Sequence, residues 1–409
     1  FFQAEDGIRD FCLSRGLGDV YKRQYLNIIS KRFDKSLVLL IFSLCGLGTV
    51  MMYSASVSES LNISGGLSNS LFLQSHIKKL LLGFFSLIFF ANFDYRKLKP
   101  FSPYILFLSI ALLIATKASY LISGDQSAAR WLNLGLFSLQ TSDFARLSLI
   151  IYLAYYIDKK KEKIKDFYSG LVPAIVIIYI ILLTILFQPD FSTAFLLATL
   201  GFLLLFIGGA KLSHLSLITS ISIIALIPLM LMKSYRFKRV IYWISTIFNN
   251  SNLESDLGTG HQIQQSLISL GNGGFFGLGP GNSMHKNLFL PKPHNDFIFS
   301  IIGEELGFVG AMIVLTIFLL IFKRGLGIAK NTTDTFGIIL SLGIAISIVM
   351  YAFVNIAVVT GIFPVTGLPM PLISHGGSNL VINMCSLGIL LNISKTKKGL
   401  NAGRNWVTL

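Results

Sequence analysis

The sequence predicts an all-α integral membrane protein with about ten transmembrane helices, because its composition and its apolar runs indicate that lipid is the solvent. Of the 409 residues, 53% are hydrophobic and only 13% are charged. Soluble domains carry roughly 25% charged residues. The chain also contains repeated apolar runs of roughly 20 residues, which is the length that crosses the hydrocarbon core of a bilayer.

The predicted spans follow one another along most of the chain. They cover residues 37–55, 78–93, 102–118, 141–157, 168–187, 191–209, 214–232, 297–322, 336–360 and 369–393. Most connections between them are short, which favours a single polytopic membrane domain over residues 25–409. Residues 1–24 are charged, glycine-rich and aperiodic, so we predict a non-native or disordered tail there. No small-residue cleavage site follows the first span, so no signal peptide is predicted.

The positive charge of the chain indicates topology rather than nucleic-acid binding. The formal net charge is +15, but the cations lie in loops between apolar spans. With a cytoplasmic N-terminus and ten crossings, most of the 34 Lys and Arg residues fall on the inside, which is the usual bias. Both termini are therefore predicted to be cytoplasmic. The three cysteines, Cys12, Cys45 and Cys385, form no CxxC pair, so neither a disulfide framework nor a zinc site is expected.

Two longer outward segments interrupt the short loops. They are residues 119–140 and a large extracytoplasmic loop, 233–296, between spans seven and eight. Loops on a rigid scaffold are frequent places for chemistry. Within the large loop, residues 261–270 place Ile263, Leu267 and Leu270 on one face, which predicts a helix lying on the membrane interface. The next stretch, 271–282, lacks the ending of a phosphate loop, so we expect a flexible, turn-rich connector.

Irregular backbone is also predicted between spans nine and ten. Residues 361–378 contain three prolines and four glycines. Such backbone at membrane depth must be buried in protein or line a wet cavity. We expect it to form a bent or partly re-entrant wall of a cavity that opens to the outside.

Asp296 is the strongest candidate for a catalytic residue. It lies where the polar loop meets an apolar span, so its carboxylate is predicted to be half desolvated, which raises its basicity. Such a group suits a general base near neutral pH. The alternative is a helix N-cap, a position that Asp favours. The two roles are compatible.

Several cations lie on the predicted outer side. Arg236, Lys238, Arg239 and Lys292 form a basic group in the large loop. Arginine forks match phosphate geometry, so these side chains are candidates for a phosphate or pyrophosphate headgroup. Alternatively these cations have no role in substrate binding, since long outer loops are exempt from the positive-inside bias and often carry Lys and Arg. Arg130 precedes Trp131, a predicted interfacial anchor, and either snorkels or contacts an anionic headgroup.

Charged residues within the predicted spans raise the free energy of membrane insertion, so they are expected to have a structural or functional role. Asp143 and Arg146 share a helix face at i, i+3, and each isolated charge would cost roughly 2.5–3.5 kcal/mol at mid-membrane. We predict a structural ion pair, with a proton or ion path as the alternative. Glu304 lies one or two turns beyond Asp296 and either tunes the cavity or is structural. Asp190 is predicted to cap a helix.

Six segments, taken together and in order, resemble the SEDS family (shape, elongation, division and sporulation), to which FtsW, RodA and SpoVE belong. They are YSAS (53–56), RWLNLG (130–135), QTSDFARL (140–147), QPDFSTA (188–194), PKPHNDFIFSIIGEELGFVGA (291–311) and GIFPVTGLPMPLISHGGS (361–378). The residues of the first and fifth segments are similar to those of the FtsW branch.

The resemblance implies site residues. The family's catalytic aspartate maps onto Asp296 and its arginine ahead of the tryptophan onto Arg130. Its charged pair on the fourth span, usually Glu and Lys, maps onto Asp143 and Arg146. Its SYGG tyrosine is His375 here. The predicted substrate-binding residues are Arg130, Arg236, Arg239, Lys292, His294, Glu304, Ser374 and His375.

The resemblance also implies a peptidoglycan glycosyltransferase of the bacterial cytoplasmic membrane that polymerises lipid II in cell division or elongation. Asp296 would take a proton from the acceptor's 4-hydroxyl, which attacks the donor's anomeric carbon. Basic residues would stabilise the undecaprenyl pyrophosphate leaving group. The sequence requires no cofactor, although a divalent cation could share this task. The implied partners are a class B penicillin-binding protein and other divisome or elongasome membrane proteins. The alternatives are a lipid II flippase or other transporter, and a non-catalytic division scaffold.

Overall fold

The computed structural model describes residues 33–124, 130–133, 138–188, 190–231, 241, 243–244, 259–283 and 296–395. The predicted tail at 1–24 lies outside the described residues. So do four predicted substrate-binding residues, which are Arg236, Arg239, Lys292 and His294.

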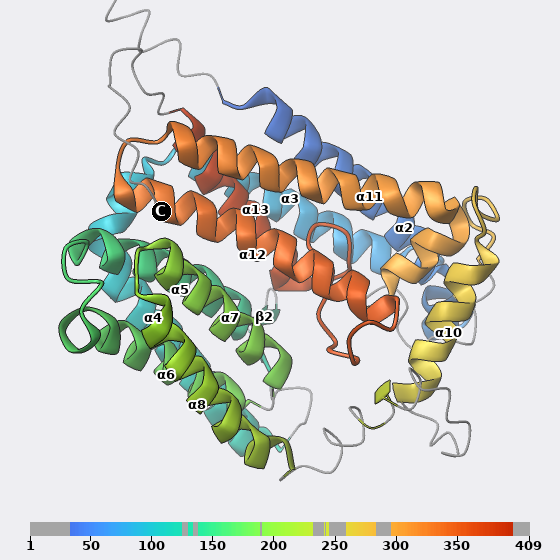
Figure 1. The fold of residues 1–409 in the computed structure, drawn as a ribbon. Helices are drawn as coiled ribbons and strands as arrows, with labels where there is room; N and C mark the ends of the chain where they lie inside the picture. The colour runs from blue at the N-terminus through green and yellow to red at the C-terminus, as the bar shows by residue number, and fades with distance from the viewer. Residues whose placement is uncertain are drawn as a thin grey trace, which may run out of the picture.

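Each of the ten predicted spans coincides, in the described part of the chain, with a helix (Figure 1). These helices are α2 (Lys35–Ile63), α3 (Leu71–Asn92), α4 (Leu98–Ser123), α5 (Thr141–Lys159), α6 (Val172–Leu186), α7 (Phe191–Ile207), α8 (Leu212–Leu231), α11 (Ile298–Asn331), α12 (Thr335–Val359) and α13 (Gly377–Ser394). By length and hydropathy, seven described segments are able to cross a membrane, and α7 and part of α8 are shorter apolar helices. The prediction of an all-helical, multi-pass membrane protein is confirmed.

The smaller elements lie in the connections. They are the short helical turns η1 (Tyr95–Lys97) and η3 (Phe167–Leu171), the antiparallel strands β1 (Trp131–Asn133) and β2 (Ser138–Gln140), and α10 (Thr259–Asn272). Three aspartates begin helices by accepting a backbone hydrogen bond, as N-cap residues do. Asp34 caps α2, Asp190 caps α7 and Asp334 caps α12. The predicted cap at Asp190 is therefore confirmed.

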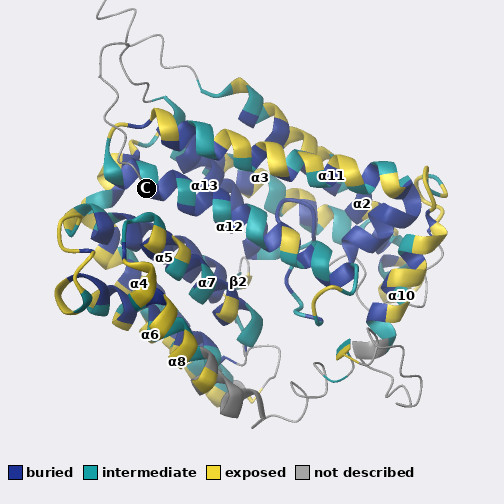
Figure 2. Ribbon diagram, in the orientation of Figure 1, coloured by how far each residue is buried: buried dark blue, intermediate teal, exposed yellow. Residues whose placement is uncertain are grey.

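The helices form two groups that meet at α12. In one group α3 packs against α13, and α11 packs against α2 and α12. In the other, α4 packs against α5 and α6 against α7, while α5 and α7 both contact α12 (Figure 1). The outward faces of α3, α4, α6 and α8 carry exposed residues, and α12 and α13 are largely buried (Figure 2). This distribution suits a bundle whose outer helices face lipid.

The connections predicted to be cytoplasmic lie together at one end of the bundle. The backbone nitrogen of Asp34, at the start of α2, donates to Ser394 Oγ at the end of α13 over 3.2 Å. Tyr95, between α3 and α4, donates from its hydroxyl to Asp334 Oδ1, between α11 and α12, over 2.5 Å. The described ends of the chain therefore share a side, as an even number of crossings requires.

The last predicted span is too long at its beginning. Residues 369–376 are not helical, and α13 begins only at Gly377. Pro369 and Pro371 lack the backbone donor that a helix needs, and Leu372 has a left-handed φ of 64°. The loop packs so tightly against α2 that a β-carbon at Gly48 would lie 2.8 Å from the Leu372 oxygen. The segment thus forms a bent, mostly buried wall, as its prolines and glycines predict.

The predicted apolar residues of α10 pack on the helical bundle: Ile263 and Leu267 both lie next to Gly361, and Leu270 lies next to Gly303. The buried positions of α10 include Ile263, Ser266 and Ser269, whereas Leu267 is 38% exposed. Ser266 Oγ donates to the Val359 oxygen of α12 over 2.8 Å. The buried face of α10 therefore contacts the helical bundle, and the serines belong to it. Apolar periodicity alone missed them because a serine that bonds a backbone carbonyl can be buried like an apolar residue.

The glycine-rich segment 271–282 is turn-rich but is not a loose connector. It makes four backbone hydrogen bonds with α11, which include Leu278 N to Glu304 O and Phe308 N to Gly274 O. Helix α11 is kinked at Gly307, where φ is 69° and ψ is −168°. A β-carbon at Gly307 would lie 2.3 Å from the Gly277 nitrogen. Glycines here allow two backbones to touch, so the prediction of flexibility was wrong.

Candidate functional site

Asp296 lies at the end of the bundle opposite the described chain termini. Helix α11 begins at Ile298 with Phe297 at its N-cap position, so Asp296 precedes the cap and does not occupy it. Asp296 is half-buried. A β-carbon built at Gly367 would lie 3.4 Å from Asp296 Oδ2. The carboxylate therefore lies against the irregular loop 361–376, which is the wall predicted for the cavity.

Asn355 fixes the backbone around this carboxylate. Its Nδ2 donates to the Asp296 oxygen and to the Leu368 oxygen, both over 2.8 Å. One buried amide from α12 thus holds the start of α11 and the loop together. The sequence analysis missed this residue. Its signal is a single amide within an otherwise apolar span, Thr335–Val359, because a buried amide must find hydrogen-bond partners.

The first turn of α13 holds Asp143 of α5. Asp143 accepts hydrogen bonds from Ser378 Oγ over 3.2 Å and from Asn379 Nδ2 over 2.8 Å. Arg146 Nη2 lies 3.9 Å from Asp143 Oδ1 and donates to Asn383 Oδ1 over 2.9 Å. These side chains are buried. The two charges are thus embedded in a polar network that joins α5 to α13.

An aromatic ring completes this network. The Arg146 guanidinium lies 4.3 Å from the centroid of the Tyr351 ring. A buried guanidinium gains from an aromatic face when water is absent. The contacts of Arg146 with α12 and α13 are those of a residue that holds helices together, and its structural role stays a prediction.

His375 and Ser374 end the irregular loop. Ser374 Oγ accepts from the Met370 nitrogen over 2.8 Å, which closes a local turn. His375 Nε2 lies 3.2 Å from Lys79 Nζ of α3, and its ring meets Phe72 edge-on at 5.6 Å. The structure therefore brings His375 to a cation that the sequence analysis did not select.

Arg130 approaches the same turn through the β-hairpin. Arg130 immediately precedes Trp131, which pairs with Gln140 in the β1–β2 register. The Gln140 nitrogen donates to Ser378 Oγ, in the first turn of α13, over 2.9 Å. The hairpin, whose first strand directly follows Arg130, is therefore attached to the first turn of α13, the helix that His375 precedes.

Glu304 lies elsewhere. It is fully buried, and its Oε2 accepts from Ser269 over 3.0 Å and from Ser283. The neighbouring Glu305 accepts from Ser54 Oγ over 2.5 Å. These bonds attach α10, Ser283, which directly follows the glycine-rich segment, and α2 to the kinked α11. The contacts of Glu304 favour the structural alternative over a direct contact with substrate.

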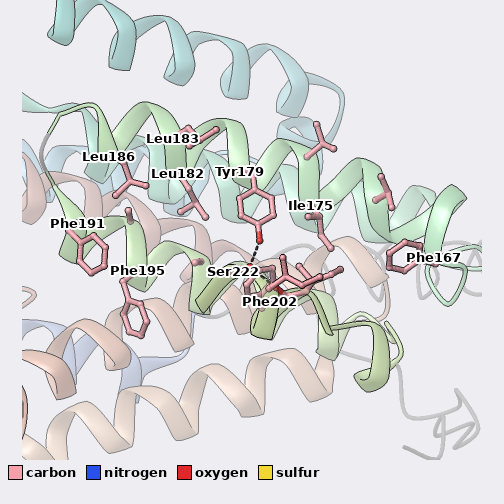
Figure 3. Close-up of a pocket in the computed structure, with 16 residues that line it drawn as sticks. Phe167, Ile175, Tyr179, Leu182, Leu183, Leu186, Phe191, Phe195, Phe202 and Ser222 are labelled. Atoms are coloured by element: carbon pink, nitrogen blue, oxygen red, sulfur yellow. Dashed lines mark hydrogen bonds between the residues drawn. The ribbon is translucent and has the colours of Figure 1, made fainter. Parts of the chain in front are cut away.

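A separate apolar groove of about 490 Å³ lies between α6, α7 and α8. Figure 3 shows Tyr179 pointing toward Ser222, with a hydrogen bond between their hydroxyl groups. The other lining side chains are apolar, among them Leu183, Phe195 and Phe202. Among the described residues, the lining of the groove contains no carboxylate and no cation. In the described residues no group of three His, Cys, Asp or Glu is arranged to hold a metal ion.

The comparisons with known proteins match nearly the whole chain. A family model described as "Cell cycle protein", which covers FtsW, RodA and SpoVE, matches residues 35–399. The chain is 38% identical to "Probable peptidoglycan glycosyltransferase FtsW" of Trichlorobacter lovleyi, over 88% of this chain and 93% of that protein. It is 33% identical to "Stage V sporulation protein E" of Bacillus subtilis, over 88% of this chain and 97% of that protein.

Two solved structures share the fold. A chain from the structure described as "Structural coordination of polymerization and crosslinking by a peptidoglycan synthase complex" has a TM-score of 0.72 at 24% identity, and covers 90% of this chain and 98% of that one. The rod shape determining protein RodA of Thermus thermophilus has a TM-score of 0.64 at 23% identity, with the same coverage.

Proposed function

Because this chain belongs to the cell-cycle protein family of FtsW, RodA and SpoVE, we propose that it is a peptidoglycan glycosyltransferase that polymerises lipid II. The observation that carries the proposal is the position of Asp296. It is half-buried at the end of the bundle opposite the described termini, and Asn355 fixes its backbone against the loop 361–376.

Asp296 acts as the general base in this proposal. A carboxylate that is partly removed from water is a stronger base than one in solution. It takes the proton of the acceptor sugar's 4-hydroxyl as that oxygen attacks the anomeric carbon of the donor. The bond from that carbon to the lipid pyrophosphate breaks, and the electron pair leaves with the phosphate oxygen. A base in this position contributes typically about 10²–10⁴-fold to the rate.

The leaving group requires positive charge close to the reacting centre. We assign this task to Arg130 and His375. Two observations support this choice: His375 lies just before the N-terminus of α13, and the strand that follows Arg130 pairs with Gln140, which is bonded to Ser378 of α13. Arg236, Arg239, Lys292 and His294 of the large loop complete the proposed substrate contacts. Ser374 and Glu304 act in this scheme through the backbone segments that they hold. The scheme needs no resident cofactor, and a divalent cation would assist at the same phosphates.

The proposed setting is the bacterial cytoplasmic membrane, with both termini in the cytoplasm and Asp296 at the outer face. The contact of Asp34 with Ser394 supports termini on one side. The proposed partner is a class B penicillin-binding protein, which would crosslink the new strands during division or elongation. One structurally similar complex is described as coordinating polymerization and crosslinking, which is the division of labour that we propose here.

The test replaces Asp296 by Asn, which keeps the size of the side chain and removes its basicity. Purified protein with its partner should polymerise lipid II, and Asp296→Asn should lose at least about 100-fold of that rate. Asp166→Asn, which changes an exposed aspartate at the other end of the bundle, is the matched control. Equal polymerisation by both variants would remove the catalytic assignment. Loss of lipid movement across vesicles with polymerisation retained would favour a transporter.

A further inference from the structure

The N-terminus of α13 has the properties of an anion site. Its N-cap position is Gly376, which offers no side-chain cap, so the first backbone N–H groups lack a capping acceptor from that residue. The aligned peptide dipoles of this 18-residue helix place partial positive charge there. Helix N-termini of this kind bind phosphate groups through backbone N–H donors.

A lysine from another helix lies at the same point. Lys79 Nζ is 3.5 Å from where a β-carbon at Gly377 would be, and it is 3.2 Å from His375 Nε2. A cation at the positive end of a helix is unfavourable without an anion. Gly377 leaves the helix end open toward Lys79, so a small anion could contact both.

His76 supplies a second, independent observation. It is only 1% exposed, and within the part of the chain that the structure describes its Nε2 has no hydrogen-bond partner. Its ring centroid lies 5.9 Å from that of His375. A buried ring nitrogen without a partner is costly, and it can donate to an oxyanion when it carries a proton.

The positive charge of Lys79, beside His76 and His375, is not balanced by a nearby carboxylate in the described part of the chain. Among the described residues no carboxylate lies within ion-pair distance of Lys79. The carboxylate at the α13 N-terminus is that of Asp143, which is already paired with Arg146. Lys79 therefore adds a positive charge that the described side chains leave uncompensated.

We propose that Lys79, His76, His375 and the N-terminus of α13 bind the diphosphate group of a polyprenyl-linked substrate, an assignment that rests on the proposed function. The lipid-borne source is favoured by α3 itself. Beyond Lys79, on the same side of the helix, it exposes large apolar side chains, among them Leu82, 43% exposed, and Phe89, 52% exposed. An anion that reaches Lys79 along this helix face arrives attached to a lipid chain.

The site would serve the same reaction as Asp296. The loop 361–376 lies against Asp296 at Gly367 and carries His375 at its other end. The base therefore lies against the same loop that carries His375, and a donor bound along this loop would have its anomeric carbon between them. Lys79 and His76 are binding residues for the leaving group in this arrangement.

The test measures binding without turnover. Full-length Asp296→Asn protein in nanodiscs is titrated with undecaprenyl diphosphate, with inorganic pyrophosphate as competitor. Adding Lys79→Gln should weaken binding at least tenfold, and Lys79→Arg should restore most of it. Lys78→Gln removes the same charge from the preceding position of the helix, which is exposed, and should leave binding unchanged. His76→Gln and His375→Gln should each weaken it severalfold.

Each outcome decides the proposal. Equal dissociation constants for the Lys79→Gln and Lys78→Gln proteins would overturn the site, provided that both keep the parent's thermal unfolding midpoint. Displacement by inorganic pyrophosphate at equal concentration would overturn the lipid-borne assignment. If the protein with Asp296 intact does not polymerise lipid II but binding still depends on Lys79, the proposed function fails and the anion site stands.

Discussion

Asn355 donates a hydrogen bond of 2.8 Å from its side-chain amide to the backbone oxygen of Asp296. The same nitrogen donates to the Leu368 oxygen over 2.8 Å, so both amide protons are used. The two acceptors belong to segments that are remote in sequence, namely the start of α11 and the loop 361–376. The side chain of Asn355 on α12 therefore helps to set the position of the proposed base relative to its wall.

Replacing Asn355 by Ala should lower both the rate of polymerisation and the stability of the bundle. Two buried carbonyl groups would lose a partner, which costs about 1–3 kcal/mol for each unsatisfied group. A displaced catalytic group of this kind costs on the order of 100-fold in rate. We expect kcat to fall by about 10–100-fold with little change in KM, measured as glycan synthesis from lipid II.

The control is Asn331→Ala, which removes an exposed asparagine at the far end of α11. It should leave both kcat and the unfolding midpoint unchanged. An Asn355→Ala protein with normal kcat would show that the amide does not position Asp296.

Neutralising one member of the Asp143–Arg146 pair should destabilise the bundle more than neutralising both. Asp143→Asn leaves the buried guanidinium without its counter-charge, and Arg146→Gln leaves a buried carboxylate. Removing one partner of a buried pair costs about 3–5 kcal/mol, whereas the pair itself contributes little net stability. The double variant should therefore unfold at a higher temperature than either single variant. Thermal unfolding in one detergent provides the measurement, and additive losses would contradict a structural pair.

The sequence was sufficient to predict the helices because lipid imposes a simple rule on spanning segments. Each predicted span coincides with a helix, and the caps at Asp34, Asp190 and Asp334 follow the usual residue preference. The error at residues 369–376 has a physical cause. Hydropathy counts Leu372 and its neighbours as membrane residues, but it does not register that the prolines there prevent a helix.

The candidate site was less predictable because it depends on contacts between remote segments. Asp296 was identifiable from its place at the edge of a span. Asn355 and Lys79 were not selected, because Asn355 bonds Asp296, 59 residues away, and Lys79 lies beside His375, 296 residues away. The glycine-rich segment was misjudged for the same reason, since its ordering acceptors and donors belong to α11. Composition indicates that a loop can form turns, but it does not indicate which segment the loop will pack against.

Gly307→Ala should strongly destabilise the contact between α11 and the glycine-rich segment. Gly307 combines φ 69° and ψ −168°, a backbone region that is essentially restricted to glycine. Its β-carbon would also meet the Gly277 nitrogen at 2.3 Å. We expect a loss of stability above about 2 kcal/mol and weaker polymerisation, measured by thermal unfolding and glycan synthesis.

The matched control is Gly271→Ala, at a position where nothing lies within 4 Å of the added carbon. Gly271 belongs to α10, so the alanine should be neutral or stabilise the protein by about 0.5–1 kcal/mol. If both alanine variants unfold at the same temperature, the contact between the glycine-rich segment and α11 does not contribute to stability.

The proposed topology predicts which introduced thiols an impermeant reagent can reach. In a protein whose own cysteines are replaced by serine, Leu67→Cys lies between α2 and α3 at a 93% exposed position. Lys161→Cys lies in the exposed connection between α5 and α6. With cytoplasmic termini, a charged maleimide added to spheroplasts should label the cysteine at position 67 and leave position 161 unlabelled until the membrane is permeabilised. The connection at Leu67 and the start of α11 are separated by an even number of crossings, so Leu67 and Asp296 lie on the same side of the membrane. The reverse labelling pattern would therefore place Asp296 on the cytoplasmic side, where it could not polymerise lipid II at the outer face.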